Sequence, residues 1–224
     1  MSSDPTITPP PVDALKDVPE LKLPPRVKFS RQRWFFTGLL RLSYRLWTRI
    51  AAGLFPEDSK SELLAQSLHI PLPDKLNMSW VTEHLAVGGR VHPSDIPALA
   101  QTGIRHVVDT RAEYCDDAEA MAREQIELLH LPTDDTYPLT VEQLWQGAAW
   151  VHERMEKGEH CLIHCEHGVG RSVLLTSAVL VYSGMHAQDA LQLVQEKRWQ
   201  AAPNHSQVTR LREFEADCTA RRNA

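Results

Sequence analysis

The alternation of short β-rich runs with helical patterns, which begins near residue 78, restricts the fold more than any other feature. The runs have the length and composition of strands and lie at 79–89, 104–110, 126–132 and 160–165. The helical patterns lie at 92–103, 116–125, 140–158, 171–184 and 187–199, with a last helix beginning near 203. Strands separated by helices of this length favour an α/β fold with a mostly parallel central sheet flanked by helices.

Residues at the ends of these patterns support the helix boundaries. Ser94 is the expected cap of the helix over 92–103, and Gly103 is its expected stop. Thr140 and Gln143 have the spacing of a capping box that opens the helix over 140–158. Asn204 is the expected cap of the last helix. The compact domain therefore covers about residues 78–220.

The N-terminal part of the chain has a different composition. Residues 1–25 hold seven of the 15 prolines and lack the apolar run of a signal peptide. We therefore expect a disordered, proline-rich leader over 1–30, followed by a helix and linker over 31–77.

Residues 34–55 form an apolar segment that contains three arginines, too many charges for a membrane span. At 100° per residue, Arg41, Arg45 and Arg49 form one stripe opposite an apolar arc that includes Leu46 and Ile50. This N-terminal basic amphipathic helix can lie in a membrane interface as a peripheral contact, or it can pack on the domain. The sequence leaves both possibilities open.

Composition excludes some functions and suggests a compartment. A net charge of −5 gives no indication of nucleic-acid binding. Four cysteines are too few for a disulfide scaffold of this length, which favours a reducing compartment such as the cytoplasm.

The stretch HCEHGVGRSV, residues 164–173, lies between the last predicted strand and a helix, where ligands bind in parallel sheets. Gly168 and Gly170 permit a turn whose amides converge with the helix N-terminus into a cradle for an anion. There the thiol of Cys165 would be stabilised as a nucleophilic thiolate. Arg171 can bind two phosphoryl oxygens, and Ser172 can donate a hydrogen bond to the sulfur.

This stretch resembles the His-Cys-x5-Arg-Ser/Thr signature of the protein tyrosine phosphatase superfamily, and its Gly-x-Gly-Arg-Ser ending is similar to the dual-specificity branch. The segment 85–114 is also similar to mitochondrial-type lipid phosphatases. The resemblance implies a two-step phosphoryl transfer without metal or cofactor. Its catalytic residues here are the nucleophile Cys165, Arg171 and Ser172, and His164 supports them. Its phosphate-binding loop is Glu166, His167, Gly168, Val169 and Gly170.

The resemblance also implies a general-acid aspartate about thirty residues before the cysteine. Asp134 and Asp135 both lie in that region, and Asp135 is 30 positions ahead of Cys165. We favour Asp135 as the acid, with Asp134 as the alternative.

Three other interpretations of these residues remain. The cluster of His160, Cys161, His164, Cys165 and His167 could bind zinc, but alternate residues of a strand point to opposite sides. The site could also bind phosphate without turnover. Finally, Cys115 could form a regulatory disulfide with Cys165, whereas Cys161 lies about 13 Å along the strand from Cys165 and is out of reach.

The substrate is the least determined property. Glu166 stands where lipid-directed relatives often carry lysine, and its charge should repel polyphosphorylated headgroups. This favours a monophosphate. The compact region that resembles the family, about residues 78–218, suits a dual-specificity domain and favours phosphotyrosine, phosphoserine or phosphothreonine in proteins. A phospholipid monophosphate, such as phosphatidylglycerophosphate at a membrane surface, is the second possibility.

Overall fold

The structure is a computed structural model in which residues 76–223, 60–68 and the single positions Ser43, Leu46, Ile50 and Leu54 are described. The predicted leader over 1–30 lies outside the described residues. So does the predicted helix over 34–55, except for the four single positions, which are helical.

A five-stranded sheet forms the centre of the domain, in the order β1-β2-β5-β3-β4. Its strands are β1 (Met78–Trp80), β2 (Leu85–Gly88), β3 (Ile104–Arg111), β4 (Glu127–Thr133) and β5 (His160–His164). β1 pairs antiparallel with β2, and the other three pairings are parallel. The predicted mostly parallel sheet is confirmed, and its central strand is the one that precedes Cys165.

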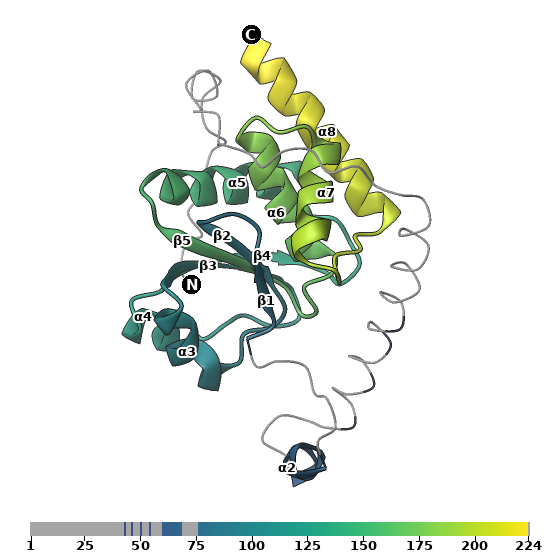
Figure 1. The fold of residues 1–224 in the computed structure, drawn as a ribbon. Helices are drawn as coiled ribbons and strands as arrows, with labels where there is room; N and C mark the ends of the chain where they lie inside the picture. The colour runs from purple at the N-terminus through teal and green to yellow at the C-terminus, as the bar shows by residue number, and fades with distance from the viewer. Residues whose placement is uncertain are drawn as a thin grey trace.

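Helices cover both faces of this sheet, as Figure 1 shows. One face carries α5 (Val141–Glu156), α6 (Arg171–Tyr182), α7 (Ala187–Lys197) and α8 (His205–Asn223). The other carries η2 (Pro93–Asp95), α3 (Ile96–Gln101) and α4 (Ala118–Arg123), while the short α2 (Lys60–Ser67) precedes the sheet in sequence. Each face has its own hydrophobic cluster, and α6 is buried along its whole length. The helix that follows the Cys165 loop is therefore held firmly on the sheet.

Most predicted helix ends are confirmed, and one is wrong. Thr140 and Gln143 form the capping box of α5, and Gly103 ends the α3 segment with a φ of +91°. Ser94 is not a cap, because Pro93 starts a 3-10 turn one residue earlier with His92 at its N-cap. The side chain of Ser94 instead contacts His92 and Asp95.

No helix in the described part of the chain is both long enough and apolar enough to cross a membrane.

Candidate active site

Cys165 lies directly after β5, at the carboxyl end of the central strand, and is 3% exposed. The strands β3 and β4 run parallel to β5 and end at the same edge of the sheet. The segments that follow β3 and β4 therefore begin at the edge where Cys165 lies (Figure 1). We call residues 165–170 the anion loop and residues 134–139, which follow β4, the acid loop.

The carbonyl groups of the anion loop are turned away from the sulfur. Those of residues 166, 169 and 170 accept hydrogen bonds from the backbone amides of Arg90, Ala202 and Leu174. Those of residues 167 and 168 accept hydrogen bonds from the side chain of Arg198. With the carbonyls engaged outside, amide groups can face inward, and the amide of Gly168 donates to the Cys165 sulfur over 3.2 Å.

Gly168 is required by this arrangement. Its φ is +65°, and a Cβ there would lie 2.4 Å from the Arg198 guanidinium and 2.6 Å from the backbone of Gly88. A larger residue would push the loop away from β2.

The surroundings of Cys165 favour the thiolate. Burial alone would raise the pKa of the thiol, but the charge of Arg171 and hydrogen bonds from Ser172 and Gly168 outweigh it and lower that pKa below its ordinary value. The Ser172 hydroxyl lies 3.3 Å from the sulfur. The sequence predicted the hydrogen bond from Ser172 and the presence of Arg171 beside the thiolate.

Arg171, at the first position of α6, is held by two residues from the ends of β3 and β4. Its Nη1 and Nη2 donate to the two carboxylate oxygens of Glu113, each over 2.7 Å, and Nη1 also donates to the Thr133 carbonyl over 2.7 Å. Burial would lower the pKa of Arg171, but the bond to Glu113 and the charge of the Cys165 thiolate raise it. The guanidinium is thus fixed and charged beside the sulfur.

Asp135 of the acid loop reaches the same arginine. Its carboxylate lies 3.2 Å from Nη2 of Arg171, and its side chain is half exposed. For Asp134 the structure gives a backbone contact, in which its carbonyl accepts from the amide of Tyr137. The geometry thus brings Asp135 together with Cys165, Arg171 and Ser172.

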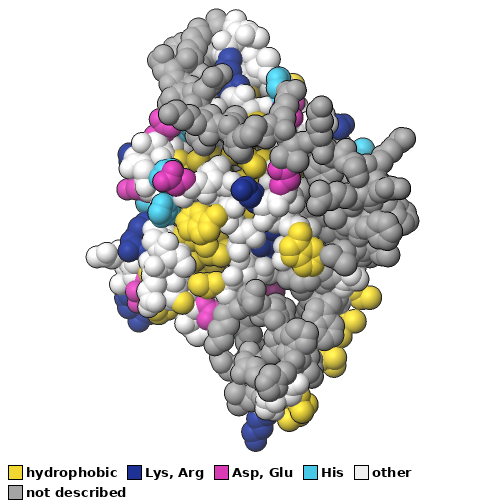
Figure 2. Space-filling model, viewed as in Figure 1, with side chains coloured by type: hydrophobic (Ala, Val, Ile, Leu, Met, Phe, Trp, Pro, Cys, Tyr) yellow, Lys and Arg dark blue, Asp and Glu magenta, His cyan; other side chains and the backbone are white. Residues whose placement is uncertain are grey.

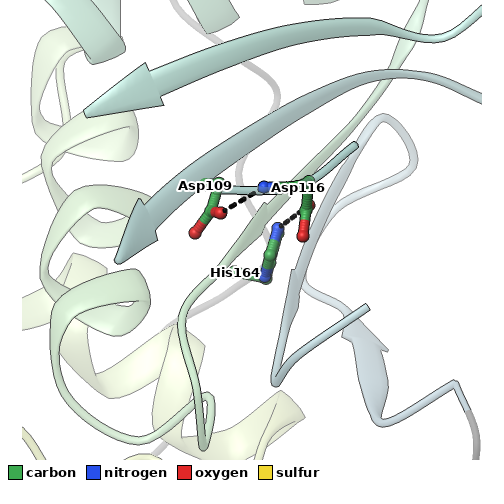
Figure 3. Close-up of side chains that lie close together, drawn as sticks. All are labelled: Asp109, Asp116 and His164. Carbon is green, nitrogen blue, oxygen red and sulfur yellow. Dashed lines mark hydrogen bonds and ion pairs between the residues drawn. The ribbon is translucent and has the colours of Figure 1, made fainter. Parts of the chain in front are cut away.

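His164 belongs to a buried network of charges beneath the anion loop (Figure 3). Its Nε2 lies 2.8 Å from Asp116, whose amide donates to Asp109 over 3.2 Å. Arg111 binds both carboxylates. Burial would lower the pKa of His164, but Asp116 raises it above its ordinary value, and His164 and Arg111 in turn lower the pKa of Asp116 against the effect of burial. The two carboxylates thus face the Arg111 guanidinium and the His164 ring.

Glu166 is engaged by two arginines. Its carboxylate lies 3.4 Å from Arg90 and 3.4 Å from Arg111. The charge that was expected to repel polyphosphorylated headgroups is therefore partly compensated, which weakens that argument about the substrate.

The five residues of the zinc interpretation do not converge. Within the described residues, the group of potential metal ligands that lie close together is Asp109, Asp116 and His164, and Arg111 binds both of its carboxylates. Cys161 points into the core, where its thiol lies 4.0 Å from the Val151 carbonyl, and burial raises its pKa to about 12.

Cys115 carries a free, exposed thiol. Partial desolvation of its sulfur and the charges of Asp109 and Asp116 raise its pKa, which disfavours the thiolate form that would attack another sulfur. The disulfide with Cys165 stays a prediction.

Sequence reasoning missed Glu113, Arg198 and the buried network. Glu113 could have been found as a residue of the site, because it lies two residues after β3 and parallel strands bring such residues to one edge. Arg198, at the end of α7, gave no local signal, because its hydrogen-bond partners are far away in sequence. They lie in the anion loop, in β1 at Ser79 and just before β1 at Asn77.

Comparison with known proteins agrees with this geometry. The family profile "Dual specificity phosphatase, catalytic domain" matches residues 86–217. Dual specificity protein phosphatase 22-B of Danio rerio is 30% identical over 136 residues, which cover 60% of this chain and 72% of that protein. The crystal structure of Tk-PTP in the active form aligns with a TM-score of 0.59 at 29% identity, covering 62% of this chain and 97% of that one. PTPMT1 in complex with PI(5)P aligns with a TM-score of 0.61 over 65% of this chain and 98% of that one, and at 22% identity it shows the fold. The chain belongs to the dual-specificity phosphatase family of the protein tyrosine phosphatase superfamily and is an enzyme of that class.

Proposed function

We propose that this phosphatase hydrolyses phosphomonoesters through a phosphocysteine intermediate. The observation that carries the proposal is the placement of a stabilised Cys165 thiolate beside the fixed Arg171, with the Asp135 carboxylate on the same guanidinium. These are the nucleophile, the oxyanion binder and the acid that the reaction needs.

In the first step, the Cys165 sulfur attacks phosphorus, the S–P bond forms, and the P–O bond to the leaving group breaks. Asp135, protonated, gives its proton to the leaving oxygen. Glu113 occupies the Nη1 and Nη2 end of Arg171. Two phosphoryl oxygens then bind at the edge formed by Nε and Nη2, where they replace the Asp135 carboxylate on Nη2.

In the second step, the Asp135 carboxylate takes a proton from water, which attacks phosphorus and breaks the S–P bond. Inorganic phosphate leaves, and the thiolate is restored. Ser172 donates a hydrogen bond to the leaving sulfur from 3.3 Å.

Hydrolysis of para-nitrophenyl phosphate tests this mechanism. We expect Cys165→Ser to lose activity by roughly a thousandfold or more. With phenyl phosphate, whose leaving group needs the proton, Asp135→Asn should lower kcat/KM far more than Asp134→Asn, which is the matched control. If the wild-type chain binds phosphate but does not turn the ester over, the site is a phosphate-binding module instead.

We propose phosphoproteins as the substrates. Within residues 76–223, the large hydrophobic side chains that are exposed are Tyr114, Tyr137 and Trp199, at 48%, 65% and 42%. Tyr114 follows Glu113, Tyr137 belongs to the acid loop, and Trp199 follows Arg198, so each lies on a segment that contacts the site. Exposed aromatic residues of this kind anchor peptides.

Phospholipid monophosphates are the second candidate, because apolar side chains of the N-terminal segment are exposed. Leu46, Ile50 and Leu54 are 61%, 42% and 59% exposed, in a stretch where residues 26–50 carry seven basic residues and no acidic one. Figure 2 shows hydrophobic side chains along the lower right edge of the molecule. An exposed apolar row in a basic segment suits an anionic membrane surface.

Two measurements separate the candidates. Parallel kinetics with phosphotyrosyl peptides and with phosphatidylglycerophosphate in vesicles should give the higher kcat/KM for the peptides. Flotation with anionic liposomes should be lost in the double variant Leu46→Glu, Ile50→Glu and kept in Leu64→Glu, the control in α2. If the lipid is the better substrate and flotation follows this pattern, the second candidate is correct.

We also propose a cytoplasmic location, which the four free thiols at 115, 161, 165 and 218 support.

A further inference from the structure

The first turn of α8 touches both catalytic loops. The Asn204 side-chain oxygen accepts from the Gln207 amide over 3.0 Å, and the Gln207 side-chain oxygen accepts from the Asn204 amide over 2.9 Å. This reciprocal pair is a capping box, so the predicted cap at Asn204 is confirmed.

The cap does not account for the amide nitrogens of the same two side chains. Asp and Glu offer the same acceptor oxygens and would cap the helix equally well. The nitrogens instead donate to the acid loop: Asn204 Nδ2 to the Thr136 carbonyl over 2.6 Å, and Gln207 Nε2 to the Tyr137 carbonyl over 3.2 Å. The amide chemistry of both residues is thus explained by the loop that carries Asp135.

Gln207 also packs against the anion loop. A Cβ at Gly170 would lie 2.8 Å from its side-chain oxygen and 3.0 Å from its nitrogen, so the amide rests on the Gly170 backbone. Gln207 is 1% exposed. One buried side chain therefore contacts the residue before Arg171 and the residue two positions after Asp135.

The acid loop needs such support. Thr136 has a φ of +71°, a left-handed conformation that costs a residue other than glycine about 1–3 kcal/mol and persists only where neighbours enforce it. The two bonds from α8 fall on Thr136 itself and on Tyr137 next to it.

We propose that Asn204 and Gln207 are positioning residues that hold the acid loop over the anion loop and so set how efficiently Asp135 protonates the leaving group. This inference rests on the proposed two-step mechanism. It predicts that their side-chain donors affect substrates with poor leaving groups, which need the proton, more than substrates with good ones.

The test uses the full chain with Asn204→Asp and Gln207→Glu, which keep the capping oxygens and remove the donors. Because a buried glutamate can take a proton and donate again, Gln207→Met serves as a second variant. Ser206→Ala is the control, since the Ser206 hydroxyl donates to Asn204 over 2.7 Å on the capping side. Thermal melting monitors the fold of each protein.

The readout is kcat/KM, which reports the steps up to the phosphocysteine, for phenyl phosphate and para-nitrophenyl phosphate. We expect kcat/KM to fall about tenfold for phenyl phosphate and less than about threefold for para-nitrophenyl phosphate. The tenfold fall is smaller than the roughly 10²–10⁴-fold rate contribution of a general acid, because Asp135 is displaced and not removed. In an Asp135→Asn background the same substitutions should leave the ratio of the two esters unchanged. Ser206→Ala should leave it unchanged in both backgrounds.

Three results would overturn the proposal: an unchanged ester ratio in all three folded variants, an effect that persists without Asp135, or an equal effect in Ser206→Ala. A wild-type chain that hydrolyses neither ester would instead overturn the proposed function, and the positioning role with it.

Discussion

Single residues determine the charge state of the nucleophile. The Cys165 pKa is lowered by Arg171 and by the bonds from Ser172 and Gly168, all of which are neighbours in the anion loop or at its end. Because these residues are contiguous in sequence, their roles could be predicted from the sequence alone. Glu113 could not be assigned to Arg171 in this way, since 58 residues separate them and their contact depends on the strand order.

The first prediction concerns the Ser172 hydroxyl. Ser172→Ala removes a hydrogen bond to the thiolate, so the pKa of Cys165 should rise. The pH dependence of iodoacetamide alkylation should show a midpoint below the ordinary thiol value of about 8.5 in the wild type and a higher midpoint in the variant. Identical midpoints would contradict the assigned role of Ser172.

The second prediction concerns Glu113. Glu113→Gln keeps the size of the side chain but removes the charge that holds both terminal nitrogens of Arg171, so we expect kcat/KM to fall about tenfold or more. Glu119→Gln, an exposed glutamate in the first turn of α4, is the matched control and should behave like the wild type. Equal rates for the two variants would contradict the prediction.

At the level of elements, the local patterns were predictable and the contacts between elements were not. The strand β5, the anion loop and α6 follow one another in sequence, so their order could be predicted. The capping box was predictable for the same reason, because Thr140 and Gln143 are three residues apart. The network of Asp109, Arg111 and Asp116 with His164 joins the end of β3 to the end of β5. It exists because these strands are neighbours, which strand patterns do not encode.

The third prediction is a pH dependence of stability from this network. The pKa of His164 is raised by Asp116, so its contribution to stability is complete below about pH 6.5 and is lost as pH rises through the folded-state value. The pKa of Asp116 is lowered, so its contribution is present above about pH 3.9 and is lost as pH falls through its folded-state value. The network should therefore stabilise the fold most between about pH 4 and 6.5.

Urea unfolding between pH 6 and 9 checks this. It should be done in a Cys165→Ser background, because the lowered thiol pKa adds stability in the opposite direction as pH rises. Stability should fall with pH, by at most about 1.4 kcal/mol per pH unit for one proton, and Asp116→Asn should flatten the slope. A slope that is the same with Asn at 116 would show that another group causes it.

At the scale of the whole molecule, the described members of the two hydrophobic clusters lie within residues 76–218. The fourth prediction is that a chain beginning at residue 76 folds with a urea unfolding free energy within about 0.5 kcal/mol of the full chain and keeps its activity on para-nitrophenyl phosphate. A large loss of stability would show that the N-terminal part packs on the domain, which is the alternative that the amphipathic pattern left open.

The strand order also affects when the active site forms during synthesis and folding of the chain. β5 lies between β2 and β3 in the sheet but is synthesised after both, so the centre of the sheet is its last strand to be made. Before β5 inserts, we expect the sulfur that follows it to react as an ordinary thiol, because the anion loop and the first turn of α6 are not yet fixed around it. We therefore expect no reactive thiolate in a growing chain. During refolding, the rate of alkylation at Cys165 should rise at the time when β5 joins the sheet.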